Sequence, residues 1–242
     1  MKIVGMIPAR YESSRFPGKP LIQIKGKTLI RRVWEKARKA INEEDIYVLT
    51  DDQRIEEHCS KEGIRTVMTS TSCLTGTDRV YEASREVNAD IYINIQGDEP
   101  LIEPSDIKKV VEVSLMYPDT IINAMCPILT SEDFINPSIP KVVTTQTGKL
   151  LFISRSPIPI SKNKNFKKAM KQVCIYSFPS EKLHMFGRMK NKTPLEEIED
   201  IEILRFLEMD IEVKMIEVSG SSIAVDHPED VEKVLKVLND QA

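Results

Sequence analysis

Residues 2–21, KIVGMIPARYESSRFPGKPL, pass from a short apolar run into a loop rich in positive charge. The apolar run, residues 2–7, is typical of a strand buried in a parallel sheet. The loop after it carries three cations, Arg10, Arg15 and Lys19, together with a glycine that allows close approach of the backbone. Such a loop at a strand end is suited to binding a polyphosphate, although an ordinary surface loop can have the same composition. It matches neither the GxxxxGKS/T nor the GxGxxG pattern, which argues against those two phosphate-binding motifs.

Strand-like and helix-like segments alternate along the rest of the N-terminal half. Strands are expected at 46–50, 65–68 and 91–96, and helices at 28–41, from Asp51 or Asp52 to Gly63, at 77–88 and at 104–117. This alternation predicts an α/β fold with a doubly wound, mostly parallel sheet and helices on both faces. Ligands of such sheets bind at the carboxyl ends of the strands, where the basic loop lies.

The second half of the chain is richer in strands. We expect strands at 122–128, 140–145, 149–156, 173–178 and 211–218, with a turn at 145–149, and helices near 180–189, 194–208 and 227–238. A lysine- and asparagine-rich stretch, residues 160–172, is either solvated surface or a lid or subunit contact. The chain is therefore expected to be a single α/β domain over 1–242, with a small strand-rich insertion at about 130–180.

Composition limits the possible partners. The 242 residues include 34 basic and 37 acidic side chains, with a net charge of −3, so we expect no nucleic-acid binding. No apolar run is long enough to suggest membrane insertion, and the N-terminus has no signal-peptide pattern. The four cysteines lie far apart without a CxxC motif, as expected for reduced thiols in a cytoplasmic protein.

Two aspartates follow strand-like runs that lie far apart in the sequence. Asp98 stands in IQGDEP (95–100), and Asp226 stands in AVDHPED (224–230) after the run 222–226. Each is explained by a turn or a helix cap, or both carboxylates together hold Mg²⁺ against phosphate oxygens. Glu99, Glu229 and Asp230 are expected to interact with helix dipoles near caps.

The motifs of this chain resemble those of the CMP-Kdo synthetase (3-deoxy-manno-octulosonate cytidylyltransferase) family of sugar-activating enzymes. The resemblance is carried by IPARYESSRFPGKPL (7–21), TGTDRV (75–80), NIQGDEPLI (94–102), SRSPIP (154–159) and VDHPED (225–230). It spans nearly the whole chain and implies a nucleotide-diphospho-sugar transferase fold. It also implies transfer of CMP from CTP to a 2-keto-3-deoxy sugar acid, with release of pyrophosphate, for bacterial surface polysaccharide or lipopolysaccharide.

The resemblance also implies roles for particular residues. Lys19, Arg10 and Asp98 would be catalytic, and Asp98 and Asp226 would hold Mg²⁺. The nucleotide would be bound by Pro8, Ala9, Arg10, Arg15, Lys19, Thr77, Arg79 and Gln96, with Asp78 and Thr77 ordering that region. The sugar would be bound by Gln96, Gln172, Tyr176 and Glu202. The family usually forms homodimers, so the insertion at 130–180 would serve dimerisation and sugar binding.

The sugar-binding half departs from the family pattern. QVCIY (172–176) places Gln172 where the family has histidine and Cys174 where it has glycine, and IEILR (201–205) places Ile203 where it has glutamine. Gln172 can form hydrogen bonds but cannot carry charge, and Ile203 offers neither donor nor acceptor. Either the sugar acid differs in one substituent, or a neighbouring group compensates, or the two sequences are misaligned here.

Two other functions fit the same motifs less well. The chain could activate a nine-carbon, sialic-acid-like sugar, but QGDEP and the short length favour the eight-carbon substrate. It could also be a nucleotide-binding regulator without catalysis, but retention of Lys19 and of both aspartates argues against that.

Overall fold

The computed structural model describes residues 1–13, 15–163 and 165–240. Ser14 and Lys164, which belong to the basic loop and to the lysine-rich stretch, lie outside the described residues, as do residues 241–242. In the described part of the chain, no helix has the length and hydropathy needed to cross a membrane.

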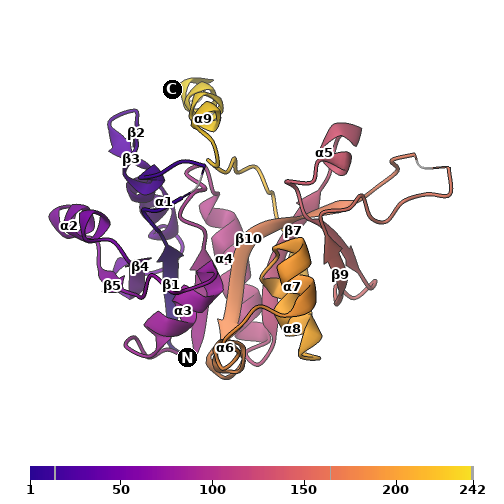
Figure 1. Ribbon diagram of the computed structural model, residues 1–242, viewed down its shortest axis with the longest axis horizontal. Helices are drawn as coiled ribbons and strands as arrows, with labels where there is room; N and C mark the ends of the chain where they lie inside the picture. The colour runs from indigo at the N-terminus through magenta and orange to yellow at the C-terminus, as the bar shows by residue number, and fades with distance from the viewer. Residues whose placement is uncertain (14, 164, 241–242) are drawn as a thin grey trace.

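The described residues form one main sheet of nine strands, which runs through the middle of the molecule (Figure 1). Its continuous order is β11 (Val213–Glu217), β7 (Ile121–Pro127), β10 (Met170–Pro179), β6 (Ile91–Ile95), β1 (Ile3–Pro8), β4 (Ile46–Thr50) and β5 (Thr66–Met68). Strands β6, β1, β4 and β5 are parallel, as are β11 and β7, and β10 runs antiparallel between the two groups. The predicted fold class, an α/β domain with a mostly parallel sheet, is confirmed.

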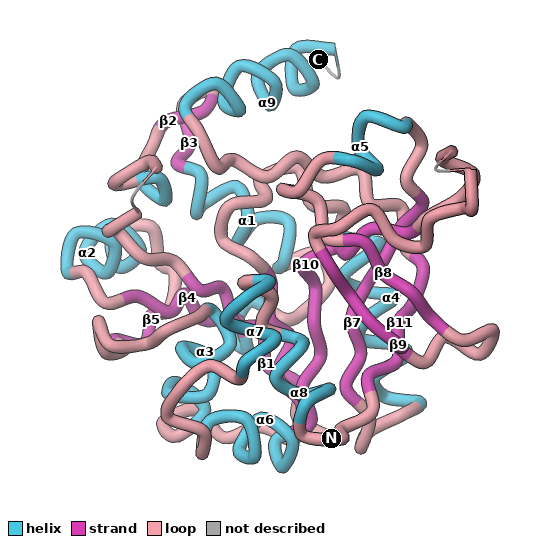
Figure 2. The backbone as a smooth tube through the Cα atoms, turned by 45° about the vertical axis from the view of Figure 1, so that its right-hand side comes forward, coloured by secondary structure: helices cyan, strands magenta, loops and turns pink. Residues whose placement is uncertain are grey.

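Helices cover both faces of this sheet, as expected for a doubly wound fold (Figure 2). On one face, α1 (Leu29–Ala37), α2 (Gln53–Lys61) and α4 (Pro104–Met116) contribute to one apolar core cluster. On the other face, α3 (Gly76–Ser84), α6 (Ser180–Gly187) and α8 (Ile203–Glu208) contribute to a second cluster. Residues of β1 alternate between the two clusters, Val4 and Met6 in one and Ile7 in the other, because successive side chains of a strand point to opposite faces.

Local signals set the ends of several elements where the sequence indicates them. Asp52 caps α2 by accepting a hydrogen bond from the Arg54 amide, and Gly63 follows the helix with φ of 70°. Short elements complete the N-terminal half: the 3₁₀ turns η1 (Lys19–Leu21) and η2 (Glu43–Asp45), and the two-stranded sheet of β2 (Gln23–Ile24) and β3 (Lys27–Thr28).

The insertion carries α5 (Ser131–Ile135), β8 (Lys141–Thr144) and β9 (Leu150–Ser154) before the chain returns in β10. β8 and β9 pair as the expected hairpin, with the turn at 145–149. Part of the lysine-rich stretch packs on α5, because the rings of Phe166 and Phe134 lie 5.0 Å apart.

Two expected elements are wrong. The helix expected at 194–208 is two helices, α7 (Pro194–Glu199) and α8, because Asp200 between them adopts φ of 50°, in the left-handed region. Residues 222–226 form no strand: they cross the end of the sheet as a loop into α9 (Pro228–Asp240). We call residues 218–227 the strap.

Candidate active site

The ends of β1 and β6 meet at the edge of the sheet where the basic loop begins. The two strands are parallel neighbours, so the loops after Pro8 and Ile95 emerge side by side. Gly97 permits this close approach, since a Cβ there would lie 2.5 Å from the Pro8 carbonyl oxygen. The QGDEP motif is therefore held against the start of the basic loop.

Two adjoining cavities open at this edge. One, of about 250 Å³, lies between the basic loop, the N-terminus of α3 and Gln96; we call it the loop cavity. The other, of about 470 Å³, is walled by β10, the insertion and the strap; we call it the strand cavity. Six of the described residues line both: Arg15, Gln96, Asp98, Asp200, Glu202 and Asp226. A ligand in one cavity can therefore reach a ligand in the other at the two aspartates.

Two cations of the basic loop contact the two aspartates at this junction. Lys19 Nζ lies 2.9 Å from Asp98 Oδ2 and 3.5 Å from Asp226 Oδ1, and its side chain is mostly buried. Arg15 lies 3.2 Å from Asp226 and is half-exposed, and Arg10 is exposed and lines the loop cavity. Gly18 starts the turn that carries Lys19, with φ of 71°. Lys19 and Arg15 are thus brought together with the two carboxylates, and Arg10 lies on the wall of the adjoining loop cavity.

Asp226 reaches this junction through the strap. The Val225 amide donates to the Asp98 carbonyl at 2.9 Å, and Asp230 in the first turn of α9 accepts from the amides of Asp226 and His227. At its other end the strap is held by Asp106 of α4. That buried carboxylate accepts from the Ser219 amide, the Ser219 hydroxyl and the Gly220 amide at 3.0, 2.6 and 3.1 Å. The position of Asp226 is therefore set by the hydrogen bonds of the strap to Asp98, to α9 and to α4, because Asp226 does not follow a strand.

The donor set at the junction fits Mg²⁺. Asp98 and Asp226 present partly exposed carboxylates to the same lysine ammonium, and hard oxygen ligands suit this cation. The described residues hold no group of three or more histidines, cysteines or carboxylates that could form a metal site. A magnesium ion here would depend on two carboxylates and on oxygens of the substrate or of water.

The N-terminus of α3 forms the opposite wall of the loop cavity through Thr75, Gly76 and Arg79. Buried Arg79 donates to Asp51 at 2.7 Å and to Thr69, so its charge is compensated. Thr77 is fully buried, and its amide and hydroxyl donate to Glu202, which also accepts from the Gly76 amide at 3.0 Å. Of the residues predicted to bind the nucleotide, Thr77 is thus directed at Glu202. The others line the loop cavity: Pro8, Ala9, Arg10, Arg15, Lys19, Arg79 and Gln96.

Glu202 connects the two cavities. Burial raises the pKa of its carboxyl, while hydrogen bonds from the start of α3 act in the opposite direction. Because both carboxylate oxygens bind α3, this side chain fastens the segment between α7 and α8 to the loop cavity.

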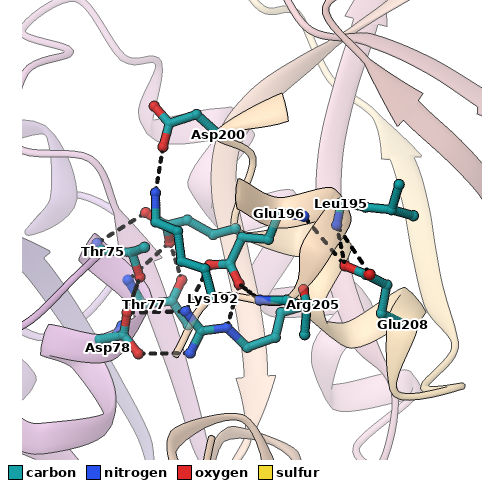
Figure 3. A network of polar contacts seen from close by, with 12 residues as sticks. Thr75, Thr77, Asp78, Lys192, Leu195, Glu196, Asp200, Arg205 and Glu208 are labelled. Atoms are coloured by element: carbon teal, nitrogen blue, oxygen red, sulfur yellow. Dashed lines mark hydrogen bonds and ion pairs between the residues drawn. The ribbon is translucent and has the colours of Figure 1, made fainter. Parts of the chain in front are cut away.

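A buried network of charged side chains also holds the segment between α7 and α8 in place (Figure 3). Arg205 of α8 is fully buried and donates to Glu196 of α7 at 2.6 and 2.7 Å and to Asp78 of α3 at 2.8 and 3.3 Å. Asp78 also accepts from the Thr75 hydroxyl at 2.6 Å. The expectation that Asp78 and Thr77 order this region agrees with these contacts.

The strand cavity contains the remaining predicted sugar ligands, Gln172 and Tyr176, on β10. Cys174 lies between them on the cavity wall, and burial raises the pKa of its thiol and of the Tyr176 hydroxyl. Ile203 is buried in the apolar cluster with Leu204 and Phe206, so this departure from the family pattern lies in the core. The departures that reach the cavity are Gln172 and Cys174.

Several residues at the strand cavity escape prediction from the sequence alone. Arg155 and Lys171 line it as cations, and Glu99 is buried in its wall. Burial, with the charge of Asp98 beside it, raises the pKa of Glu99 to about 7. Glu99 precedes α4, whose N-cap is Glu103, and its buried carboxyl lies in the wall of the strand cavity. The SRSPIP and QGDEP motifs contain Arg155 and Glu99, but only the fold shows which side of each motif faces the cavity.

Comparisons with known proteins agree with the fold. The model of the cytidylyltransferase family matches residues 4–215. The mitochondrial 3-deoxy-manno-octulosonate cytidylyltransferase of Arabidopsis thaliana is 41% identical over 246 residues, which cover 99% of this chain and 84% of that protein. The enzyme of the same name from Geobacter metallireducens is 39% identical over 251 residues, covering 99% and 98%.

A solved structure of CMP:2-keto-3-deoxy-manno-octonic acid synthetase complexed with CTP superposes with a TM-score of 0.93, at 35% identity and with full coverage of both chains. A doubly wound sheet with a basic loop and paired carboxylates at its edge defines the class, a nucleotide-binding α/β enzyme. This chain belongs to the cytidylyltransferase family, in the group of the 3-deoxy-manno-octulosonate cytidylyltransferases.

Proposed function

We propose that this protein transfers CMP from CTP to the anomeric hydroxyl of 3-deoxy-manno-octulosonate or a close analogue, giving CMP-sugar and pyrophosphate. One observation carries the proposal: a basic cavity and a second polar cavity join where Lys19 contacts both Asp98 and Asp226. A transfer between two bound substrates needs such a junction, because the reacting atoms have to meet there. The curated relatives named above support the identity of both substrates.

The loop cavity supplies what a nucleoside triphosphate requires. Arg10, Arg15 and Lys19 converge from one loop and can neutralise the triphosphate. Lys19 is best placed to stabilise charge that develops on the α-phosphate and on the departing pyrophosphate, because it lies at the junction and is held by both carboxylates. Ala9, Arg79 and Gln96 line the part of the cavity available to the base and ribose.

Asp98 and Asp226 would hold Mg²⁺. When bound, this cation supplies charge neutralisation at the α-phosphate and acidification of a coordinated hydroxyl. The transfer is then an in-line displacement: the sugar hydroxyl oxygen forms a bond to the α-phosphorus, and the bond to the pyrophosphate oxygen breaks. The proton of the hydroxyl passes to solvent.

The strand cavity supplies what a sugar acid requires. Its carboxylate needs a cation, and three line the cavity: Arg15, Arg155 and Lys171. Arg15 already pairs with Asp226, and Arg155 donates to the backbone carbonyls of Asp200 and Pro137. Lys171 has no ion pair among the described residues, so it is available to the substrate carboxylate.

The wider setting follows from the same proposal. A homodimer formed through the insertion at 130–180 is supported by exposed apolar side chains there: Ile135, Leu151 and Ile160 are each at least half-exposed. A cytoplasmic location is supported by the four cysteines, all free in the structure. The CMP-sugar would serve the synthesis of surface polysaccharide or lipopolysaccharide.

Pyrophosphate release tests the proposed function. The purified protein with CTP and Mg²⁺ should release pyrophosphate with 3-deoxy-manno-octulosonate and little with a nine-carbon sialic acid. Asp98→Asn and Asp226→Asn should each lower the rate about 100-fold or more, because each loses a charged group that acts at the reacting phosphate. Asp119→Asn, an exposed control, should be unchanged. CTP binding without turnover of any sugar acid would favour the non-catalytic regulator instead.

A further inference from the structure

Strand β10 contains a bulge in the wall of the strand cavity. Its pairing with β7 shifts register between Val173 and Tyr176, so the carbonyls in the bulge lose their places in the ladder. Asn123 of β7, fully buried, satisfies them: its Nδ2 donates to the carbonyls of Val173 and Ile175, each at 3.0 Å. Since backbone carbonyls only accept, the orientation of this side-chain amide is fixed.

Because the Asn123 amide is fixed, it also fixes the orientation of the Gln172 side-chain amide. Asn123 Oδ1 has to face the other way, and there it accepts from Gln172 Nε2 at 2.9 Å. Because an amide oxygen cannot donate, Gln172 has to contribute its nitrogen to this contact. Its Oε1 has no hydrogen-bond partner among the described residues, and the half-buried side chain lines the strand cavity.

We propose that Asn123 is a positioning residue that presents Gln172 Oε1 as a hydrogen-bond acceptor for one hydroxyl of the sugar acid. The proposal rests on the proposed function and adds to it the polarity of one subsite. An acceptor at this point favours a hydroxyl that donates and disfavours the substrate carboxylate, whose oxygens also only accept. The sugar acid is thereby oriented with its carboxylate toward the cations of the cavity and one hydroxyl toward Gln172 Oε1.

Deoxyfluoro analogues test this polarity, because fluorine replaces a hydroxyl without donating a hydrogen bond. We expect one analogue in the series, substituted at a hydroxyl outside the reacting centre, to lose about 10- to 100-fold in kcat/KM with the wild-type protein. Gln172→Leu should lower kcat/KM for the parent sugar acid by a similar factor. It should also abolish the preference for parent over that analogue and leave the KM for CTP unchanged.

The role of Asn123 is tested by the same preference, expressed as the ratio of kcat/KM for the parent sugar acid to kcat/KM for the fluoro analogue. Asn123→Ser should lower the preference for the parent over the fluoro analogue, and a purely structural role would lower stability and total rate without changing that preference. If Asn123→Ser does not fold, the ratio measured with Gln172→Leu still decides. Equal use of parent and analogue at every position by the wild type, or an unchanged ratio in Gln172→Leu, would overturn the inference while the proposed function stands. Absence of turnover with the parent sugar acid would overturn both.

Discussion

Lys19 is the residue on which the proposed chemistry depends most directly. Asp98 and Asp226 are far apart in the chain, yet both contact its ammonium group. The sequence could indicate each of the three residues by motif, because each motif is local. Their mutual distances depend on the neighbouring ends of β1 and β6 and on the strap, which no local pattern describes.

At the same scale, Lys171 is expected to recognise the substrate carboxylate. Lys171→Gln should raise the KM for the sugar acid about 10-fold or more, because a charge-assisted hydrogen bond is lost, and leave the KM for CTP unchanged. Steady-state pyrophosphate release measures both constants. Lys168→Gln is the matched control, since Lys168 is exposed on the neighbouring loop. An equal rise in KM for a methyl ester of the sugar acid would contradict the role in carboxylate binding.

At the scale of elements, the strap determines where the second carboxylate lies. Asp106→Asn keeps the shape of the side chain but cannot accept from all three donors of Ser219 and Gly220. We expect about 10-fold more Mg²⁺ to be needed for half-maximal rate, with near-normal turnover restored at high Mg²⁺, because a group that orients a metal ligand is lost.

A magnesium titration of pyrophosphate release measures this effect, with Glu112→Gln on the exposed side of α4 as the control. An unchanged magnesium requirement together with lowered thermal stability would show that Asp106 stabilises the fold without positioning Asp226.

The pairing of α7 with α8 depends on Arg205. Arg205→Met removes the partner of Glu196, which is itself fully buried, and should lower the free energy of unfolding by about 3–5 kcal/mol. Urea denaturation followed by circular dichroism measures it. Arg205→Met combined with Glu196→Leu should recover part of the loss, because the fully buried Glu196 charge is then removed while Asp78 still lacks its Arg205 partner. A single variant as stable as the wild type would show that the network contributes little.

At the scale of the whole molecule, the insertion is expected to join two subunits. Leu151→Glu on β9, at a side chain 54% exposed in the single chain, should shift the protein from dimer to monomer, since a charge would be buried without a partner. Light scattering after size-exclusion chromatography measures the mass. Leu115→Glu on α4, 47% exposed, is the control and should leave the dimer intact. A wild-type mass of one chain at micromolar concentration would disprove the dimer.

Prediction from sequence succeeds where one local pattern determines an element. The alternation of strands and helices, the cap at Asp52 and the turn at 145–149 are all read from neighbouring residues. It fails at Asp200, where a non-glycine residue in a left-handed conformation breaks an apparently continuous helix. It fails again at residues 222–226, whose alternating apolar side chains pack under α9 and not in a sheet.

The fold class and the family could be predicted from the sequence, because they depend on local periodicity and on motifs that keep their spacing, and the same motifs carry the proposed triphosphate-binding residues. The arrangement of the strand cavity depends on the tertiary structure. Thr77 turns to Glu202, Ile203 enters the core, and Asn123 fixes the amide of Gln172 across a bulge. Each of these outcomes depends on a hydrogen bond or a packing contact between segments distant in the chain. The basic loop after β1 therefore indicated a polyphosphate site, whereas the polarity proposed for the sugar site depends on how β7 and β10 pair.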